Sequence, residues 1–255
     1  MGWFKYLLFK SPIKRRINGV MFEFDFSLSP YIKSMYFGWY DNEVINFMES
    51  ILKPGDTFID IGANIGYMTA KGAGLVGKTG KVHSFEPAFP YAQRLEKLSR
   101  MNPDYKIIVN QYALGEEEKE ASFIMSKENI GANAIVSDNE VNEAVKVFIH
   151  RFDKYAQEKI FKNIKLIKID VENFEFPVLK GFRNYFKNPS HRPIIICEIF
   201  PYNYPHLGST LTELLEYMGQ YGYKAYNILC PQKEIDITRL TKEVGYNIIF
   251  KASSS

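Results

Sequence analysis

The segment DTFIDIGANIG, residues 56–66, constrains the fold of this chain more than any other stretch. Around Asp60, residues 57–61 have the β-branched, aromatic and aliphatic content of a buried strand. Gly62 and Gly66 then bracket a turn in which a Cβ would keep a ligand from the backbone, and a helix is expected from about residue 65. Its free N–H groups and positive dipole end would face the ligand, and Asp60 would balance a cationic group there. The segment predicts a nucleotide-binding strand, turn and helix.

The spacing of the two glycines narrows the choice of ligand. The dinucleotide pattern G-x-G-x-x-G and the phosphate-loop ending G-K-[ST] are both absent. Residues 60–66 instead match D-x-G-x-x-x-G, which is typical of class I methyltransferases. Their cofactor, S-adenosylmethionine, carries no phosphate and needs no phosphate cradle. A plain structural turn is the alternative, because a glycine turn after a strand occurs in many α/β proteins.

A second apolar run follows at residues 81–85. It ends at Glu86 and Pro87, about twenty residues beyond the turn, which is the spacing of a doubly wound sheet. Glu86 is placed to accept both ribose hydroxyls of a nucleoside, because a carboxylate offers two acceptor oxygens and no donor. The alternative for Glu86 is a strand end in solvent.

The order of apolar segments predicts one α/β domain. The 255 residues are enough for a sizeable core. We expect a mostly parallel seven-stranded sheet with helices on both faces, formed by residues 41–255 after an N-terminal segment, residues 1–40. The expected strands are 57–61, 81–85, 106–110, 164–169, 193–197, 224–229 and 246–250, and the expected helices are 41–52, 65–76, 91–101 and 211–221.

Residues 120–150 interrupt this alternation. The runs ASFIM and VKVFIH are expected to be two strands around a polar stretch, which predicts an inserted hairpin or lid between the third and fourth strands of the sheet. Residues 127–143 lack apolar periodicity, and we expect them to be mobile without ligand.

Charge and cysteine content exclude some partners. A formal net charge of +3 does not indicate a nucleic-acid surface. Cys197 and Cys230 lack metal-ligand spacing, so no metal site is predicted, and buried reduced thiols favour a cytoplasmic location.

Residues 1–16 combine aromatic and aliphatic side chains with five basic ones. They are expected to pack on the domain or a partner subunit of a homo-oligomer, with peripheral membrane contact as the alternative.

A second acidic cluster follows the fourth strand. Asp170, Glu172 and Glu175 lie within six residues, and burying them is costly unless something uses or neutralises their charge. One could meet the cofactor's ammonium group, another could act as a base or orient a hydroxyl, and a pair could hold a divalent cation. The alternative is a solvated loop that caps the next helix, which Glu175 fits best. For Asp170 we favour a role in the site.

Several motifs in the same order resemble the FkbM family of S-adenosylmethionine-dependent methyltransferases. They are GWYDNE (38–43), PGDTFIDIGANIG (54–66), SFEP (84–87), NQYALGEEE (110–118), HRFDKY (150–155), IKIDVENFEFPVLKG (167–181) and PIIICEIFP (193–201). The resemblance implies a Rossmann-like class I methyltransferase fold, S-adenosylmethionine as cofactor, and usually O-methylation, with sugars and polyketides among the substrate classes.

The resemblance also implies roles for individual residues. The methionine part of the cofactor would lie against Asp60, Gly62, Ala63, Asn64 and Gly66, the ribose against Glu86 and Pro87, and the adenine against Tyr112 and Ala113. Asp170 and Glu172 would lie by the transferred methyl.

The chain departs from the family at Asn173, where the pattern D-x-E-G-x-E usually has Gly. Asn tolerates left-handed backbone angles better than most residues, so the turn can survive. Asp41 and Asn42 also depart, which leaves the role of Glu43 open.

Other classes of protein fit less well. A nucleic-acid amino-methyltransferase would usually show Asn/Asp-Pro-Pro-aromatic after the fourth strand, where this chain reads IDVENF. A dehydrogenase would need the three-glycine turn. A non-enzymatic scaffold, or a methyltransferase that acts on nucleic acid or protein, remains as the alternative. The sequence therefore predicts an O-methyltransferase that acts on a hydroxyl of a saccharide or related small metabolite.

Overall fold

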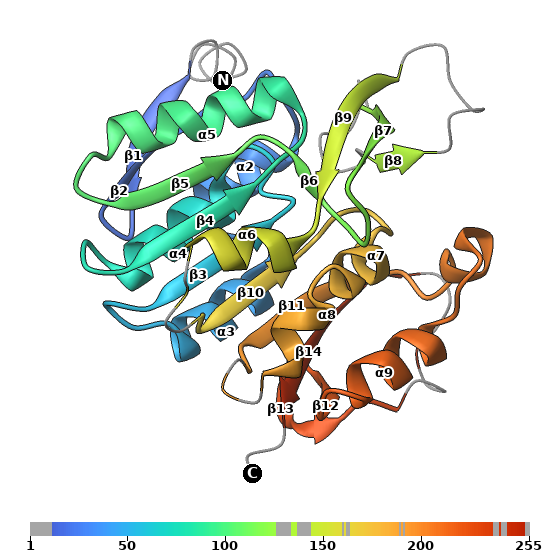
Figure 1. Cartoon of the computed structure of the whole chain (residues 1–255). Helices are drawn as coiled ribbons and strands as arrows, with labels where there is room; N and C mark the ends of the chain where they lie inside the picture. Colours follow the sequence, from blue (N-terminus) through green and yellow to red (C-terminus); the bar gives the residue numbers. More distant parts are fainter. Residues whose placement is uncertain are drawn as a thin grey trace.

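A large mixed sheet forms the centre of the molecule (Figure 1). The computed structural model describes residues 12–125, 134–136, 144–159, 161, 164–188, 190, 192–236, 240 and 244–252. Within them the strand order of the sheet is β13-β12-β14-β11-β10-β3-β4-β5. The bounds are β3 Thr57–Ile61, β4 Lys81–Phe85, β5 Lys106–Asn110, β10 Leu166–Ile169, β11 Ile194–Ile199, β12 Tyr223–Asn227, β13 Cys230–Glu234 and β14 Tyr246–Ala252.

The described part of the sheet has eight strands, not the seven expected. The additional strand is β13, an edge strand that pairs antiparallel with β12. Its sequence CPQKE has no apolar alternation, so it gave no strand signal. Cys230 lies on this edge and is exposed, so the expectation of two buried thiols is correct only for Cys197. Strands β11, β10, β3, β4 and β5 are parallel, whereas β14 runs antiparallel between β11 and β12.

Helices cover both faces of the sheet, as expected. Side chains alternate along each strand, so Phe58 packs on one face while Ile59 and Ile61 pack on the other. The first face is covered by α3 Asn42–Ile51, α4 Tyr67–Val76 and α5 Phe89–Met101; the second carries α6 Phe152–Lys159, α7 Glu175–Lys180, α8 Arg183–Lys187 and α9 Leu211–Gly219. The short 3-10 helix Tyr204–Leu207 precedes α9.

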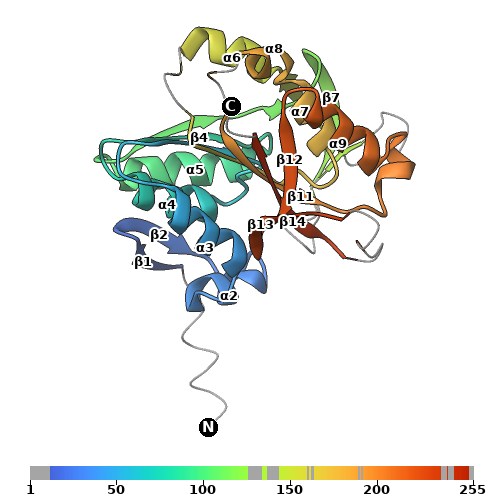
Figure 2. The same ribbon diagram turned by 90° about the horizontal axis from the view of Figure 1, so that it is seen from below.

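The chain before residue 41 shares the core of the domain. It forms the hairpin β1 Ile13–Ile17 and β2 Val20–Phe24 and the helix α2 Tyr31–Phe37. Figure 2 shows the hairpin outside α4, on the side away from the sheet. The side chain of Asn102, the C-cap residue of α5, accepts the N–H of Met21 and donates to its C=O. Residues 1–11 of the segment expected to meet a partner or membrane lie outside the described residues. Among those described, no helix is long and apolar enough to cross a membrane.

The interruption between β5 and β10 forms a second sheet. The expected hairpin is present as β7 Lys119–Ile124 and β9 Val145–His150, which pair antiparallel. The short strands β6 Ala113–Leu114 and β8 Ala134–Val136 extend it to the order β6-β9-β7-β8. Apart from residues 134–136, the expected lid at 127–143 lies outside the described residues.

Candidate active site

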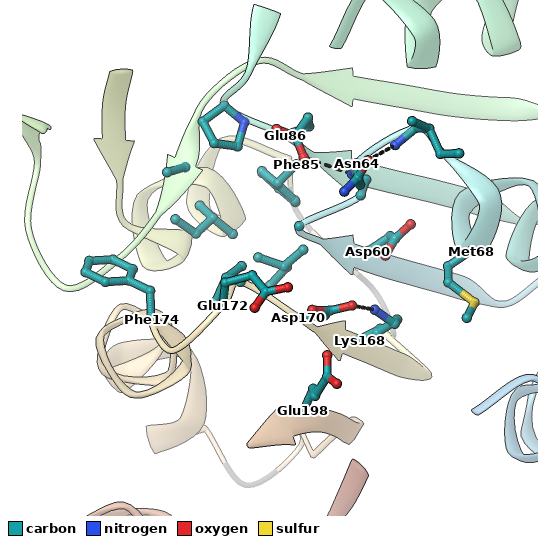
Figure 3. A pocket seen from close by; sticks show the side chains of 18 of the residues that line it. Asp60, Asn64, Met68, Phe85, Glu86, Lys168, Asp170, Glu172, Phe174 and Glu198 are labelled. Carbon is teal, nitrogen blue, oxygen red and sulfur yellow. Dashed lines mark hydrogen bonds and ion pairs between the residues drawn. The ribbon is translucent and has the colours of Figure 1, made fainter. Parts of the chain in front are cut away.

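One cavity of about 500 Å³ lies at the carboxyl ends of β3, β4, β10 and β11 (Figure 3). This is the edge at which ligands bind in doubly wound sheets. It brings together all but one of the residues for which we predicted roles: Asp60, Gly62, Ala63, Asn64, Glu86, Pro87, Tyr112, Ala113, Asp170 and Glu172. The exception is Gly66, which is the N-cap of α4 and does not line the cavity.

The turn after β3 is shaped by protein contacts. A Cβ on Gly62 would lie 1.8 Å from the carbonyl oxygen of Asp170, and one on Gly66 would lie 2.8 Å from the Leu95 side chain. Both residues also have positive φ, 79° and 88°. Our sequence argument gave ligand approach as the reason for these glycines. The structure gives another reason, which is the close approach of β10 and α5 to the turn.

The N–H groups of the turn itself, at residues 62–66, are all used within the protein. Those of residues 62, 63 and 66 donate to backbone carbonyls. Asn64 N–H donates to Glu86 Oε2 at 2.8 Å, and Ile65 N–H donates to the Asn64 side chain at 2.7 Å. A turn with this bonding is not a phosphate cradle, which fits a cofactor without phosphate.

Glu86 fixes the turn and faces the cavity. Its Oε1 accepts the N–H of Ala88 at 2.8 Å, while Oε2 accepts that of Asn64. Burial raises the pKa of Glu86 to about 7, although both N–H groups oppose the rise. Each carboxylate oxygen has two lone pairs, so both can still accept a ribose hydroxyl.

Asp60 presents an unpaired oxygen at the wall of the cavity. Its side chain is fully buried, and Oδ2 accepts the Thr69 hydroxyl at 2.6 Å. Among the described residues no group bonds Oδ1. Burial raises the pKa of Asp60, and Lys168 and Thr69 oppose the rise. A buried carboxylate oxygen without a partner is rare in native proteins and fits a ligand's ammonium group.

Lys168 is a site residue that our sequence reasoning missed. It pairs with Asp60 across β10 and β3, so both side chains project from the same face of the sheet. Its Nζ lies 2.7 Å from Asp170 Oδ2. Burial alone would lower the pKa of Lys168, but Asp170, Asp60 and Asp41 outweigh it and raise the pKa. A single lysine in the apolar run LIKI was a usable signal, because a lysine buried there needs acidic partners.

Glu198 at the end of β11 was also missed. Its side chain lines the cavity and hydrogen-bonds Asp170. Burial and the neighbouring Asp170 raise the pKa of Glu198 to about 9, so at neutral pH it is the protonated donor. Burial also opposes ionisation of Asp170, but the Lys168 ammonium and the Glu198 hydrogen bond outweigh it, and the pKa of Asp170 is lowered. Asp170 is therefore an anion whose charge Lys168 balances.

Glu172 projects from a loop with unusual backbone angles. Glu172 and Asn173 have φ of 52° and 78°, so Asn173 adopts the left-handed angles expected where the family has Gly. Burial, and then the charge of Asp170, raise the pKa of Glu172 to about 7.

Glu175 corrects the expectation of a solvated helix cap. Its side chain is only 1% exposed, and Oε1 accepts the N–H groups of Val171 and Asn173 at 3.3 and 3.0 Å. Burial raises the pKa of Glu175 to about 8. The sequence suggested capping because acids are favourable at helix starts, but this carboxyl bonds the loop before α7.

The residues near Glu43 have a structural role. Glu43 Oε1 accepts the Asn247 side-chain amide at 2.9 Å, which ties α3 to β14. Glu43 does not line the cavity. In the described parts of the chain, no group of three or more His, Cys, Asp or Glu residues is arranged to hold a metal ion.

Comparisons with solved structures agree with the class of fold. A candidate rRNA methylase from Clostridium thermocellum matches with a TM-score of 0.51 and 15% identity, over 84% of this chain and 96% of that one. The methyltransferase FkbM from Methylobacillus flagellatus matches with a TM-score of 0.50 and 16% identity, over 87% of this chain and 53% of that one. This chain thus spans about half of the latter protein. No curated protein matches the chain.

The strand order and these structural matches define a class I methyltransferase fold. The profile described as the methyltransferase FkbM domain matches residues 60–225, more than half of the chain. The chain therefore belongs to the FkbM methyltransferase family and is an S-adenosylmethionine-dependent methyltransferase. The unpaired oxygen of Asp60 and the phosphate-free turn fit that cofactor.

Proposed function

We propose that the protein is a cytoplasmic O-methyltransferase that acts on a hydroxyl of a saccharide or related small metabolite. The observation that carries the proposal is the position of Glu172 and Asp170, which line the same cavity as Asp60 and Glu86. Carboxylates can orient a hydroxyl and remove its proton, whereas enzymes that methylate base amino groups use an amide and prolines at this position.

Asp60 and Glu86 would hold the cofactor. In this proposal Asp60 Oδ1 accepts a hydrogen bond from the ammonium group, Glu86 accepts the ribose hydroxyls, and Tyr112 lies against the adenine. When bound, S-adenosylmethionine supplies a methyl group on a positively charged sulfur, which keeps the electron pair of the broken S–C bond as the new O–C bond forms. The remaining tasks of the protein are alignment of the acceptor and removal of one proton.

Glu172 is the better base of the two acids. Its pKa of about 7 leaves it partly ionised at neutral pH and basic enough to accept the hydroxyl proton. Asp170 has a lowered pKa and its charge is held by Lys168, so it is suited to orient the acceptor. The proton of the acceptor hydroxyl passes to the Glu172 carboxylate and then to solvent.

Cofactor binding is tested with S-adenosylhomocysteine by calorimetry. Glu86→Ala should weaken binding by about 1–3 kcal/mol, because ribose hydroxyls and turn N–H groups lose their acceptor. Glu49→Ala, at an exposed position on α3, is the matched control. Equal affinities for wild type and Glu86→Ala would remove Glu86 from the site.

Methyl transfer is tested with radiolabelled S-adenosylmethionine and metabolite extracts of the source cells. The label should appear as a base-stable ether on a small hydroxylated product. Label in nucleic acid or protein, or on nitrogen, would contradict the proposal while leaving the methyltransferase class intact.

A further inference from the structure

The part of the cavity facing the acids has an aromatic wall. Tyr31 and Met35 of α2, and Tyr40 just after it, line the cavity. The rings of Tyr31 and Tyr40 meet edge to face with centroids 6.3 Å apart, and Tyr40 meets Tyr67 at 5.9 Å. Tyr31 is 48% exposed, which places it at the mouth. Tyr40 lies in the field of Asp170 and Glu198, so the aromatic wall adjoins the acids.

This wall comes from outside the matched family domain. Residues 31–40 precede the match, which begins at residue 60. The cofactor residues, in contrast, lie within it. The aromatic wall therefore joins Tyr40, which belongs to the GWYDNE motif that resembles the family, to Tyr31 and Met35, which precede that motif.

The ionisable side chains that line the cavity are strongly unbalanced between acids and bases. Five are acids: Asp60, Glu86, Asp170, Glu172 and Glu198. Among the described lining residues the sole cation is Lys168, which is 3% exposed and paired with Asp170 at 2.7 Å. No described lining side chain is thus a cation available to an anionic acceptor.

We propose that the acceptor is an uncharged or amino-bearing saccharide ring whose C–H face packs on Tyr31 and Tyr40 and whose hydroxyls bond Glu172 and its neighbouring acids, and that anionic acceptors are excluded. The proposal rests on the function proposed above and adds the charge and the packing surface of the acceptor. It predicts that uronic acids and sugar phosphates are not methylated.

The preference for such an acceptor follows from the two kinds of group that a sugar ring presents. One face of a pyranose presents C–H groups, which pack on an aromatic ring, while its hydroxyls donate strong hydrogen bonds to carboxylates. A carboxylate or phosphate on the acceptor would instead be buried beside like charges without a counter-ion. An ammonium group would gain from the acids and from the aromatic faces.

The test uses three matched probes on protein saturated with S-adenosylhomocysteine. Methyl glucopyranoside is uncharged, its 2-amino analogue carries an amine at C2, and its uronate analogue carries a carboxylate at C6. Binding is measured by saturation-transfer NMR titration at pH 8. We expect the first two probes to bind and the uronate to bind at least about tenfold more weakly. In Glu172→Gln the uronate should bind more tightly relative to the glucoside, because a negative charge has been removed.

Two ring-removal variants complete the test. Tyr40→Ala should weaken glucoside binding about tenfold, which corresponds to one lost aromatic contact. Phe37→Ala, at the last residue of α2 and three residues before Tyr40, 51% exposed and not lining the cavity, is the control and should bind as wild type does. The proposal is overturned by equal binding of the uronate, by unchanged binding in Tyr40→Ala, or by no glycoside binding to protein that binds S-adenosylhomocysteine. Failure to bind S-adenosylhomocysteine would instead count against the proposed function.

Discussion

At the scale of single residues, the site is organised by one buried cation. Lys168 lies between cofactor and acceptor residues, next to Asp60 on β3 and Asp170 after β10. Its charge allows Asp170 to remain ionised although the carboxylate is partly buried. The same charge opposes the rise in the pKa of Asp60. One side chain therefore sets the protonation of acids on both sides of the cavity.

Replacing this cation should destabilise the fold. Lys168→Met removes the ammonium but keeps most of the volume, which leaves the buried Asp60 and the partly buried Asp170 without a counter-ion. We expect a loss of about 3–5 kcal/mol in the free energy of unfolding, measured by urea denaturation at pH 7. Lys106→Met on the exposed start of β5 is the control. A loss no larger than that of the control would show that Lys168 does not balance these charges.

The assignment of Glu172 as base predicts a pH dependence. Turnover should rise with pH through about 7, because Glu172 must be ionised to accept the proton. Glu172→Gln should remove this limb and lower turnover by roughly 10²–10⁴. Asp170→Asn should lower turnover but keep the limb. If the limb persists in Glu172→Gln and vanishes in Asp170→Asn, the two roles are reversed.

At the scale of elements, the loop between β10 and α7 is held by a carboxyl group of its own helix. Glu175 accepts the N–H groups on both sides of Glu172, at Val171 and Asn173. The Asn203 side chain donates to that of Asn173 at 2.8 Å from the neighbouring loop after β11. The left-handed angles of this loop are thus supported from two elements, and they aim Glu172 into the cavity.

Glu175 variants separate loop geometry from cofactor binding. Glu175→Gln keeps a carbonyl acceptor and, because Glu175 is protonated below pH 8, should retain turnover at pH 7. Glu175→Met leaves two partly buried N–H groups unpaired, which costs up to about 1–3 kcal/mol each, and should lower turnover strongly. Affinity for S-adenosylhomocysteine, measured in parallel, should stay within about threefold in both variants. Equal turnover in the two variants would mean that the loop does not depend on this carboxyl.

Sequence reasoning succeeded where an element carries its own apolar pattern. Strands β3, β4 and β5 and helices α3, α4, α5 and α9 lie within a few residues of expectation. The strand β1, IKRRI, was missed because its side chains are mostly exposed and charged, and its pairing with β2 is what defines it. In the site, acids at strand ends were found from their position. Lys168, Glu198 and Tyr40 were missed because their importance depends on which strands and loops become neighbours.

At the scale of the whole molecule, segments distant in sequence complete one cavity. The parallel strands supply the acids, residues 31–40 supply the aromatic wall, and the inserted sheet contributes Phe123 and Ile135. Figure 2 shows the N-terminal elements and α4 layered on one side of the sheet, with α6 and α8 on the other. The N-terminal boundary at residue 40 stays a prediction, although residues 12–40 pack in the shared core. The proposed acceptor site therefore requires the N-terminal elements to be folded.

The collection of buried acids predicts how stability depends on pH. The pKa values of Glu86, Glu175 and Glu198 rise on burial to about 7, 8 and 9, whereas a glutamate in the unfolded chain titrates near 4.5. Between these values the folded state binds more protons than the unfolded state, so stability falls as pH rises from about 5 to 9. Asp170, whose pKa is lowered, is ionised throughout this window and adds nothing to the pH dependence of stability.

Thermal unfolding should show a lower Tm at pH 9 than at pH 6, by about 2–4 °C for each kcal/mol lost. Glu175→Gln should reduce the difference because it cannot ionise, and Glu49→Gln, at an exposed site, should not. A Tm that rises between pH 6 and pH 9 would contradict the protonation assigned to these three groups.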